Sequence, residues 1–186
     1  MRRLALGLVH YPVLDKGGAT VTTAITNLDL HDIARCARTY GCTDYFVIHP
    51  IAAQRDLAER ICRHWIHGSS GVRIPDRKDA LSLVRVVSTL DDATRALGGD
   101  VDLWITSARE VCGSLGFHQA RRVLEGPGAP VLLLFGTGWG LADHVVEAAR
   151  VRLTPILGPS EPRYNHLSVR AACAVTLDRL RGLRED

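Results

Sequence analysis

Residues 132–141, which read LLLFGTGWGL, join an apolar run, a glycine turn and the start of a helix. Consecutive apolar residues of this kind are typical of a strand that is buried on both faces of a sheet. Glycines directly after such a strand let the main chain approach a ligand without interference from Cβ atoms. The stretch predicts either a ligand loop at the end of a parallel strand or, as an equal alternative, a purely structural turn.

Similar apolar runs recur along the chain and alternate with helical patterns. The expected strands are residues 4–9, 44–49, 84–90, 101–106, 130–135 and 152–157. The expected helices are residues 29–40, 54–66, 90–97, 118–124, 141–149 and 165–183. This alternation predicts an α/β protein with a mostly parallel sheet and helices on both of its faces.

Two segments interrupt the alternation. The turn DKGG at residues 15–18 and the threonine- and valine-rich residues that follow predict a short hairpin arm near residues 13–26. Residues 68–79 are rich in glycine, serine and proline, and we expect a long exposed loop that leads into a short helix. The length of 186 residues and the lack of a visible linker favour one domain over residues 1–186.

The composition excludes several classes of protein. With 46% hydrophobic and 23% charged residues, the chain differs from disordered, collagen-like and coiled-coil sequences. No apolar run is long enough to span a bilayer, and the N-terminal apolar stretch lacks the cleavage site of a signal peptide. The five cysteines never form a C-x-x-C pair, which argues against a disulfide framework and a zinc site. We therefore expect a cytoplasmic protein with no bound metal and no membrane partner.

The basic residues are arginines except for Lys16 and Lys78, and the net charge is +3. The arginine fork suits phosphates and nucleic acid. The base composition of the source genome is the stronger explanation, so charge alone supports only a mild inference about partners.

Two further strand ends carry residues that could bind a ligand. They are residues 106–109, and residues 156–158 together with residues 164–168. Because parallel strands present their carboxyl ends at one edge of the sheet, the three loops predict a single site. Either Asn165 or Ser168 could instead serve only as a helix N-cap. The helix after this third loop is apolar on all sides, so we expect it to be buried.

The chain resembles the SPOUT class of S-adenosylmethionine-dependent RNA methyltransferases, most closely a bacterial group of SAM-dependent RNA methyltransferases. The stretches that carry the resemblance are HYPV (10–13), TNLDLHDIARCARTYG (26–41), PDRK with AL (75–81), LLLFGTGWGL (132–141), and GPS with YNHLSVRAA (158–172). It covers practically the entire chain. It implies a SPOUT fold with a C-terminal deep trefoil knot, S-adenosyl-L-methionine as cofactor and S-adenosyl-L-homocysteine as product.

The resemblance also implies which residues bind the cofactor. They are Thr106, Ser107, Ala108, Phe135, Gly136, Thr137, Gly138, Trp139, Gly140, Leu141, Ile156, Leu157, Gly158, Tyr164, Asn165, His166, Leu167 and Ser168. Members of the class are homodimers whose active sites lie close to the subunit interface, so the last helix is also expected at that interface.

Residues 26–35 resemble the first motif of many SPOUT enzymes, in which an arginine on the first helix reaches the active site, often that of the partner subunit. The resemblance implies catalytic roles for Arg35 and Asn27. The usual glycine of the motif is absent, and His31 stands nearby. Without the resemblance, Arg35 would be read as a solvated arginine on a helix face.

The expected function is in-line methyl transfer to tRNA or rRNA at a dimer-interface site. A base that accepts a proton from the acceptor could be His10, His31, Asp29 or His166, and each is equally readable as structural. A different class of function stays open, namely a non-catalytic dimeric module that binds S-adenosylmethionine or S-adenosylhomocysteine. A dinucleotide-binding domain is disfavoured because Leu141 stands where G-x-G-x-x-G has its last glycine.

Overall fold

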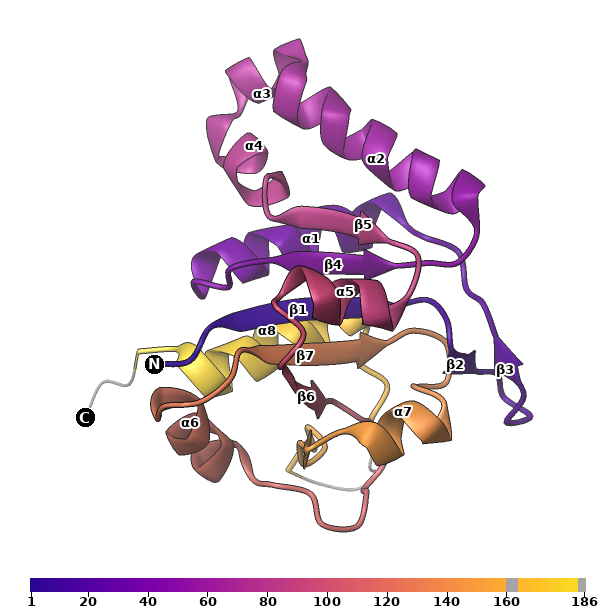
Figure 1. Cartoon of the computed structure of the whole chain (residues 1–186), viewed down its shortest axis with the longest axis vertical. Helices are drawn as coiled ribbons and strands as arrows, with labels where there is room; N and C mark the ends of the chain where they lie inside the picture. Colours follow the sequence, from indigo (N-terminus) through magenta and orange to yellow (C-terminus); the bar gives the residue numbers. More distant parts are fainter. Residues whose placement is uncertain (160–163, 184–186) are drawn as a thin grey trace.

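A computed structural model of the chain describes residues 1–159 and 164–183. Its main sheet has six parallel strands in the order β5-β4-β1-β7-β6-β8 (Figure 1). These strands are β1 (Leu4–Val9), β4 (Tyr45–Ile48), β5 (Val84–Val87), β6 (Asp102–Ile105), β7 (Val131–Gly136) and β8 (Val151–Arg152). The predicted α/β class and parallel sheet are confirmed.

Helices cover both faces of the sheet (Figure 1). One face carries α1 (Asn27–Thr39), α6 (Phe117–Glu125) and α8 (Val169–Arg181), and the other carries α5 (Leu90–Ala96) and α7 (Asp143–Ala148). Beyond β5 lie α2 (Ala52–His67), α3 (Ser69–Arg73) and α4 (Pro75–Leu81). Alternate side chains of the central strand β1 enter the two apolar cores, as the period of a strand requires.

A two-stranded antiparallel hairpin, β2 (Val13–Leu14) and β3 (Thr20–Val21), stands beside the carboxyl ends of the main strands (Figure 1). Its turn is closed by the Asp15 carboxylate, which accepts hydrogen bonds from the main-chain N–H groups of Gly17 and Ala19 at 2.8 and 2.9 Å. Gly18 adopts a φ of 84°, which favours glycine. This hairpin becomes important for the site described below.

We expected residues 68–79 to form a long exposed loop that leads into a short helix. The short helix is present as α4, but the loop was wrong, because Ser69–Arg73 forms α3, in which Ser70 and Gly71 are buried. A Cβ atom at Gly71 would lie 2.1 Å from the main-chain oxygen of Trp65, so glycine allows α3 to pack closely on the end of α2. Tertiary packing thus overrides the loop-like composition.

The last strand and the last helix are shorter than expected. Strand β8 pairs only with β6 at the sheet edge, and the chain leaves the sheet after Arg152. Helix α8 begins at Val169, because the Ser168 hydroxyl caps it by accepting a hydrogen bond from the N–H of Ala171 at 3.2 Å. Its expected complete burial was also wrong: one face is buried, while Ala171, Ala174 and Val175 are only half-buried.

The described residues contain no helix that is long and apolar enough to cross a membrane.

The buried carboxylate of Asp102 holds the amino ends of three strands together. The carboxylate of Asp102 at the start of β6 forms ion pairs with Arg2, which precedes β1, and with Arg150, which precedes β8, the latter at 2.8 Å. Burial raises the pKa of Asp102, but the two guanidinium groups outweigh that effect and hold the pKa below its usual value. Asp102 therefore links the starts of β6 and of the edge strand β8 to the start of the central strand β1.

We expect Asp102→Asn to lower the free energy of unfolding at pH 7 by about 3 kcal/mol, because it leaves the buried Arg2 guanidinium without its counter-charge. A carboxyl whose pKa is lowered on folding stabilises the protein above its unfolded pKa, about 3.9, and loses that effect as the pH falls through the folded pKa. Urea unfolding at several pH values should therefore show a weaker acid dependence in the variant below about pH 4.

The matched control is Asp79→Asn, which removes an exposed ion pair with Arg38 and should cost below about 1 kcal/mol. An equal loss of stability in both variants would contradict the structural role of Asp102.

Candidate functional site

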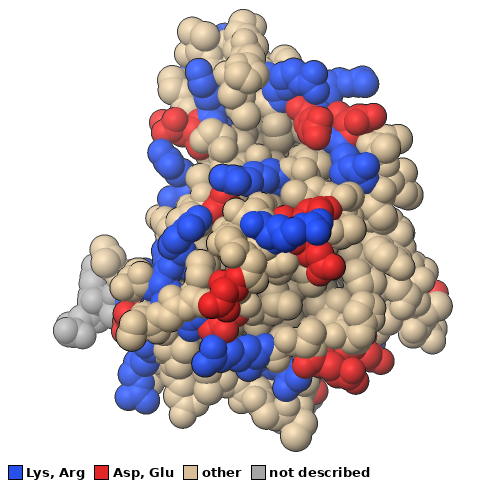
Figure 2. Space-filling view, in the orientation of Figure 1, with Lys and Arg blue, Asp and Glu red and all other residues tan. Residues whose placement is uncertain are grey.

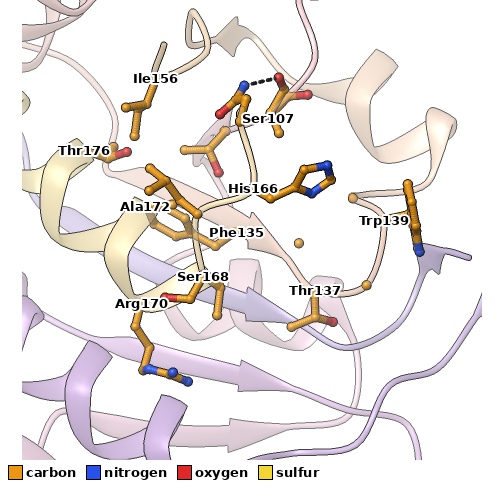
Figure 3. Close-up of a pocket in the computed structure, with 18 of the residues that line it drawn as sticks. Ser107, Phe135, Thr137, Trp139, Ile156, His166, Ser168, Arg170, Ala172 and Thr176 are labelled. Carbon is orange, nitrogen blue, oxygen red and sulfur yellow. Dashed lines mark hydrogen bonds between the residues drawn. The ribbon is translucent and has the colours of Figure 1, made fainter. Parts of the chain in front are cut away.

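A cavity of about 750 Å³ opens at the carboxyl ends of β6 and β7 (Figure 3). Its walls come from residues 106–109 after β6, residues 136–140 after β7, and residues 165–170 at the start of α8, together with residues before and within the first turn of α1. The three loops that the sequence predicts to form one site therefore meet at one cavity.

The structure places most of the predicted cofactor residues in this lining. They are Thr106, Ser107, Ala108, Phe135, Gly136, Thr137, Gly138, Trp139, Gly140, Ile156, Asn165, His166, Leu167 and Ser168. The others lie beside the cavity: Leu141 is buried in the core that contains α7, whereas Leu157, Gly158 and Tyr164 are exposed. A binding role for each of these residues stays a prediction.

The glycine turn after β7 is held by the hairpin. The N–H of Trp139 donates to the main-chain oxygen of Leu14 at 2.9 Å, and the N–H of Leu14 donates to the oxygen of Gly140 at 2.8 Å. Gly138 has a φ of 59°, and a Cβ atom there would lie 2.9 Å from the Leu14 oxygen. The N–H of Trp139 and the main-chain oxygen of Gly140 are thus bonded to the hairpin.

A chain of hydroxyl groups reinforces the same contact. The Thr137 hydroxyl donates to the main-chain oxygen of Val9 at 3.0 Å, so the Thr23 hydroxyl, 2.5 Å away, donates to Thr137. The Nδ1 atom of His10 lies 3.0 Å from the Thr23 oxygen and donates to it. Burial, followed by the neighbouring His49, lowers the pKa of His10 to about 4, so His10 is neutral at pH 7.

The first and third loops are joined by one short bond. The side-chain amide of Asn165 donates to the main-chain oxygen of Ala108 at 2.6 Å. Ser168, not Asn165, is the N-cap of α8, which resolves the alternative that the sequence left open. Asn165 therefore holds the third loop over the end of β6.

The charged floor of the cavity combines α1 with α8. Asp29 is buried, and its carboxylate accepts hydrogen bonds from the Thr26 hydroxyl at 2.7 Å and from Arg170 at 2.7 Å. Arg170 also lies 3.5 Å from Asp32. Sequence reasoning missed Arg170, although a single cation at the start of an otherwise apolar helix was a signal that could have pointed to it.

The structure places the predicted catalytic residues outside the described lining of the cavity. Asn27 is the exposed first residue of α1, between Thr26 and the aspartate of the cavity floor. Arg35 is also exposed, and its guanidinium lies 3.8 Å from Asp32, which in turn contacts Arg170. Arg35 therefore connects to the cavity through the charges of Asp32 and Arg170.

The four candidate bases fall into two groups. Asp29 and His166 line the cavity, with the His166 ring pointing toward Trp139 (Figure 3). His10 and His31 are buried and are not among the described lining residues. Burial, with a smaller effect of nearby Arg77, lowers the pKa of His31. The geometry favours Asp29 and His166.

The donor set suits an organic ligand. Within residues 1–159 and 164–183, no group of three or more His, Cys, Asp and Glu side chains could hold a metal ion. The lining instead mixes the apolar side chains of Phe135, Ile156 and Ala172 with hydroxyl groups and exposed main chain (Figure 3). The volume falls within the usual range for small-molecule and cofactor sites.

Comparison with known sequences gives one family match. The family described as "SAM-dependent RNA methyltransferase" matches residues 3–182. A protein of Oleidesulfovibrio alaskensis named tRNA (guanine-N(1)-)-methyltransferase is 44% identical over 97% of this chain. The chain spans only 42% of that relative's length. A protein of Aquifex aeolicus with no named function is 36% identical over 94% of this chain and 86% of its own length.

Comparison with solved structures agrees on the fold. The structure of TrmJ from Z. mobilis superposes with a TM-score of 0.61 and 18% sequence identity, covering 99% of this chain and 70% of that chain. This likeness confirms the expected SPOUT fold, whereas the trefoil knot itself stays a prediction.

We expect Arg170→Met to lower the free energy of unfolding by about 3 kcal/mol, because it leaves the buried Asp29 carboxylate without its partner. In the double variant Asp29→Asn with Arg170→Met, part of this loss should be recovered, since neither position of the pair then carries a charge. Urea unfolding of the single and double variants measures the coupling. The control is Arg122→Met on the exposed face of α6, which should change stability little. Strictly additive effects at the two positions would contradict the pairing.

Proposed function

The chain belongs to the SAM-dependent RNA methyltransferase family, and from that membership we propose that it transfers a methyl group from S-adenosylmethionine to RNA. The observation that carries the proposal is the meeting of three loops at one cavity, at the carboxyl edge of the sheet. Ligands bind at this edge in open α/β sheets. Because β6 and β7 are hydrogen-bonded neighbours, their loops form two adjacent walls of the cavity.

The residues present fit the cofactor. The loops after β6 and β7 and the start of α8 would hold it, with Phe135 and Ile156 against its apolar parts. The Thr106 hydroxyl donates to the Leu134 oxygen and can still accept a hydrogen bond from the cofactor. The Ser168 hydroxyl accepts from the Ala171 N–H and can still donate one. When bound, S-adenosylmethionine supplies a methyl group on a positively charged sulfur, which is already activated for displacement.

The chain's own residues then have two tasks, alignment and charge control. In-line displacement needs the acceptor held opposite the leaving group, which main-chain and side-chain contacts around a rigid cavity provide. Asp29 is the carboxylate among the described lining residues, and Arg170 holds one of its oxygens at 2.7 Å. We assign to Asp29 and His166 the task of accepting a proton from the acceptor, because both line the cavity.

We further propose a homodimer in which Arg35 acts at the cavity of the partner subunit. Arg35 lies outside the described lining of its own cavity and is exposed. Small and apolar side chains on the same side of the molecule lack full cover, with Leu28 on α1 60% exposed and Ala174 and Val175 on α8 half-buried. Their burial against a second copy would bring the two α1 helices close to the opposite active sites.

The substrate is proposed as tRNA or rRNA, with tRNA tested first because the Oleidesulfovibrio relative is named for it. The direct experiment incubates the purified protein and methyl-tritiated S-adenosylmethionine with separately purified tRNA and rRNA. Label in RNA supports the enzyme. Binding of cofactor without any label in either RNA would instead support the non-catalytic module. Nucleoside mass spectrometry of a deletion strain and its parent then identifies the methylated position.

The variant Gly138→Val should abolish binding of S-adenosylhomocysteine, measured by calorimetry. A branched side chain cannot adopt the φ of 59° without strain, and its Cβ would collide with the Leu14 oxygen that holds the turn. The matched control is Gly116→Val, because an added Cβ there meets nothing within 4 Å. Normal affinity in a folded Gly138→Val protein would overturn the assignment of the site.

The variant Arg35→Ala should lower methyl transfer about 100-fold, as loss of a preorganised donor does, and leave affinity for S-adenosylhomocysteine intact. A heterodimer of one Arg35→Ala subunit and one Gly138→Val subunit tests action in trans. It should recover about half of the parental rate, because one of its two sites then has both an intact turn and an arginine from the partner. A heterodimer as inactive as either parent variant, or a parental rate in Arg35→Ala alone, would contradict the proposal.

A further inference from the structure

Three aromatic side chains from two different loops gather beside the mouth of the cavity. Trp139 comes from the glycine turn and is 46% exposed, and Tyr164 precedes α8 and is 77% exposed. The ring of His166 stands between them, with centroid distances of 6.3 Å to Trp139 and 5.6 Å to Tyr164. In Figure 3 the His166 ring points toward Trp139, and the two ring planes meet nearly at a right angle, 78°. This group, Trp139, His166 and Tyr164, is the aromatic rim.

An arginine comes from the loop that is bonded to the aromatic rim. The hydrogen bond from Asn165 to the Ala108 oxygen fixes the third loop against the first. Arg109 directly follows Ala108, while Tyr164 and His166 flank Asn165 in sequence. Arg109 lines the same cavity and is exposed. One short bond thus holds the main chain that carries Arg109 against the main chain that carries two of the rings.

The rings of the aromatic rim are exposed and are not needed to pack the core. Single exposed apolar side chains are ordinary, but a contiguous exposed group marks a binding surface. The turn that carries Trp139 is fixed through main-chain bonds to Leu14, so the position of the turn does not depend on the indole ring. The ring is therefore available to contact a ligand that approaches from solvent.

The chemistry of the aromatic rim fits an unpaired nucleobase. Aromatic faces stack on any base, and an adjacent arginine can hold the phosphate backbone; this combination is typical of proteins that bind single-stranded nucleic acid. An enzyme that modifies a nucleotide in a cavity must also receive that nucleotide outside a base-paired stack. The cavity lies directly behind the aromatic rim.

We propose that Trp139, His166 and Tyr164 form a stacking site for an unpaired nucleobase of the RNA substrate, and that Arg109 contacts an adjacent phosphate. The inference rests on the proposed function and deepens it, because it states that the substrate nucleotide is single-stranded or turned out of its helix. In this arrangement the Trp139 side chain contacts the RNA, while the turn that carries it stays fixed by its main-chain bonds to Leu14.

The test measures binding of a short fluorescein-labelled single-stranded RNA and of the same sequence as a duplex, by anisotropy with S-adenosylhomocysteine present. The parental protein should bind the single strand more tightly. Trp139→Leu should weaken that binding about tenfold, the scale of one lost base stack, while Trp139→Phe retains most of it. The matched control is Tyr11→Leu, an aromatic with 44% exposure outside the described lining of the cavity, which should bind normally.

Salt dependence separates the roles of the ring and the guanidinium. Arg109→Gln should reduce the slope of log affinity against log salt by about 1, as loss of one phosphate contact does. Trp139→Leu should lower affinity at every salt concentration with the slope unchanged. The control for charge is Arg60→Gln on the exposed side of α2.

Calorimetry with S-adenosylhomocysteine distinguishes this inference from the proposed function. Because Trp139 also lines the cavity, we expect Trp139→Leu to lose much less affinity for S-adenosylhomocysteine than for RNA, and to lose methyl transfer to RNA. Parental RNA affinity in Trp139→Leu, or a loss of cofactor affinity as large as the loss of RNA affinity, would overturn the stacking site while leaving the enzyme assignment in place. Failure of the parental protein to label any RNA would instead overturn the proposed function.

Discussion

Two main-chain hydrogen bonds hold the wall of the cavity in place: the Trp139 N–H donates to the Leu14 oxygen, and the Leu14 N–H donates to the Gly140 oxygen. Main-chain bonds of this kind tolerate many side chains but demand that the two backbones come close together. Glycine at position 138 satisfies that demand, because the Leu14 oxygen occupies the space that a Cβ atom would need. The hairpin therefore supports the site, and the hydrogen bond between the Thr23 and Thr137 hydroxyls is a further attachment between the two segments.

The charged floor of the cavity, where α1 meets α8, depends on an ion pair. Asp29 in the first turn of α1 is buried, and a buried carboxylate requires compensating hydrogen bonds. Arg170 supplies one of them from the first turn of α8, so the N-terminal ends of two helices far apart in sequence are tied at the cavity. Arg170 also contacts Asp32, and Asp32 in turn contacts Arg35 at the surface. Structural stability and the proposed chemistry thus share these residues.

Backbone and side chains have separate tasks in the loops. The turn after β7 is shaped by main-chain bonds, which leaves the Trp139 ring exposed at the cavity mouth. The loop before α8 is anchored by the Asn165 amide and by the Ser168 cap. The rings of Tyr164 and His166, on either side of Asn165 in sequence, project from this loop. A rigid frame with exposed aromatic side chains can bind one ligand inside the cavity and contact a second ligand at the aromatic rim.

The sequence by itself determined the α/β class, the order of most strands and helices, and the three loops of the site, because apolar runs and helical periods are local signals. Only the tertiary structure decided that Ser69–Arg73 is helical, since the need for glycine at position 71 is visible only from its distance to Trp65. It also decided that the hairpin supports the glycine turn and that Arg170 reaches Asp29, across 141 positions. Contacts between distant segments leave no periodic trace along the chain, and they can be found only where the fold brings the segments together.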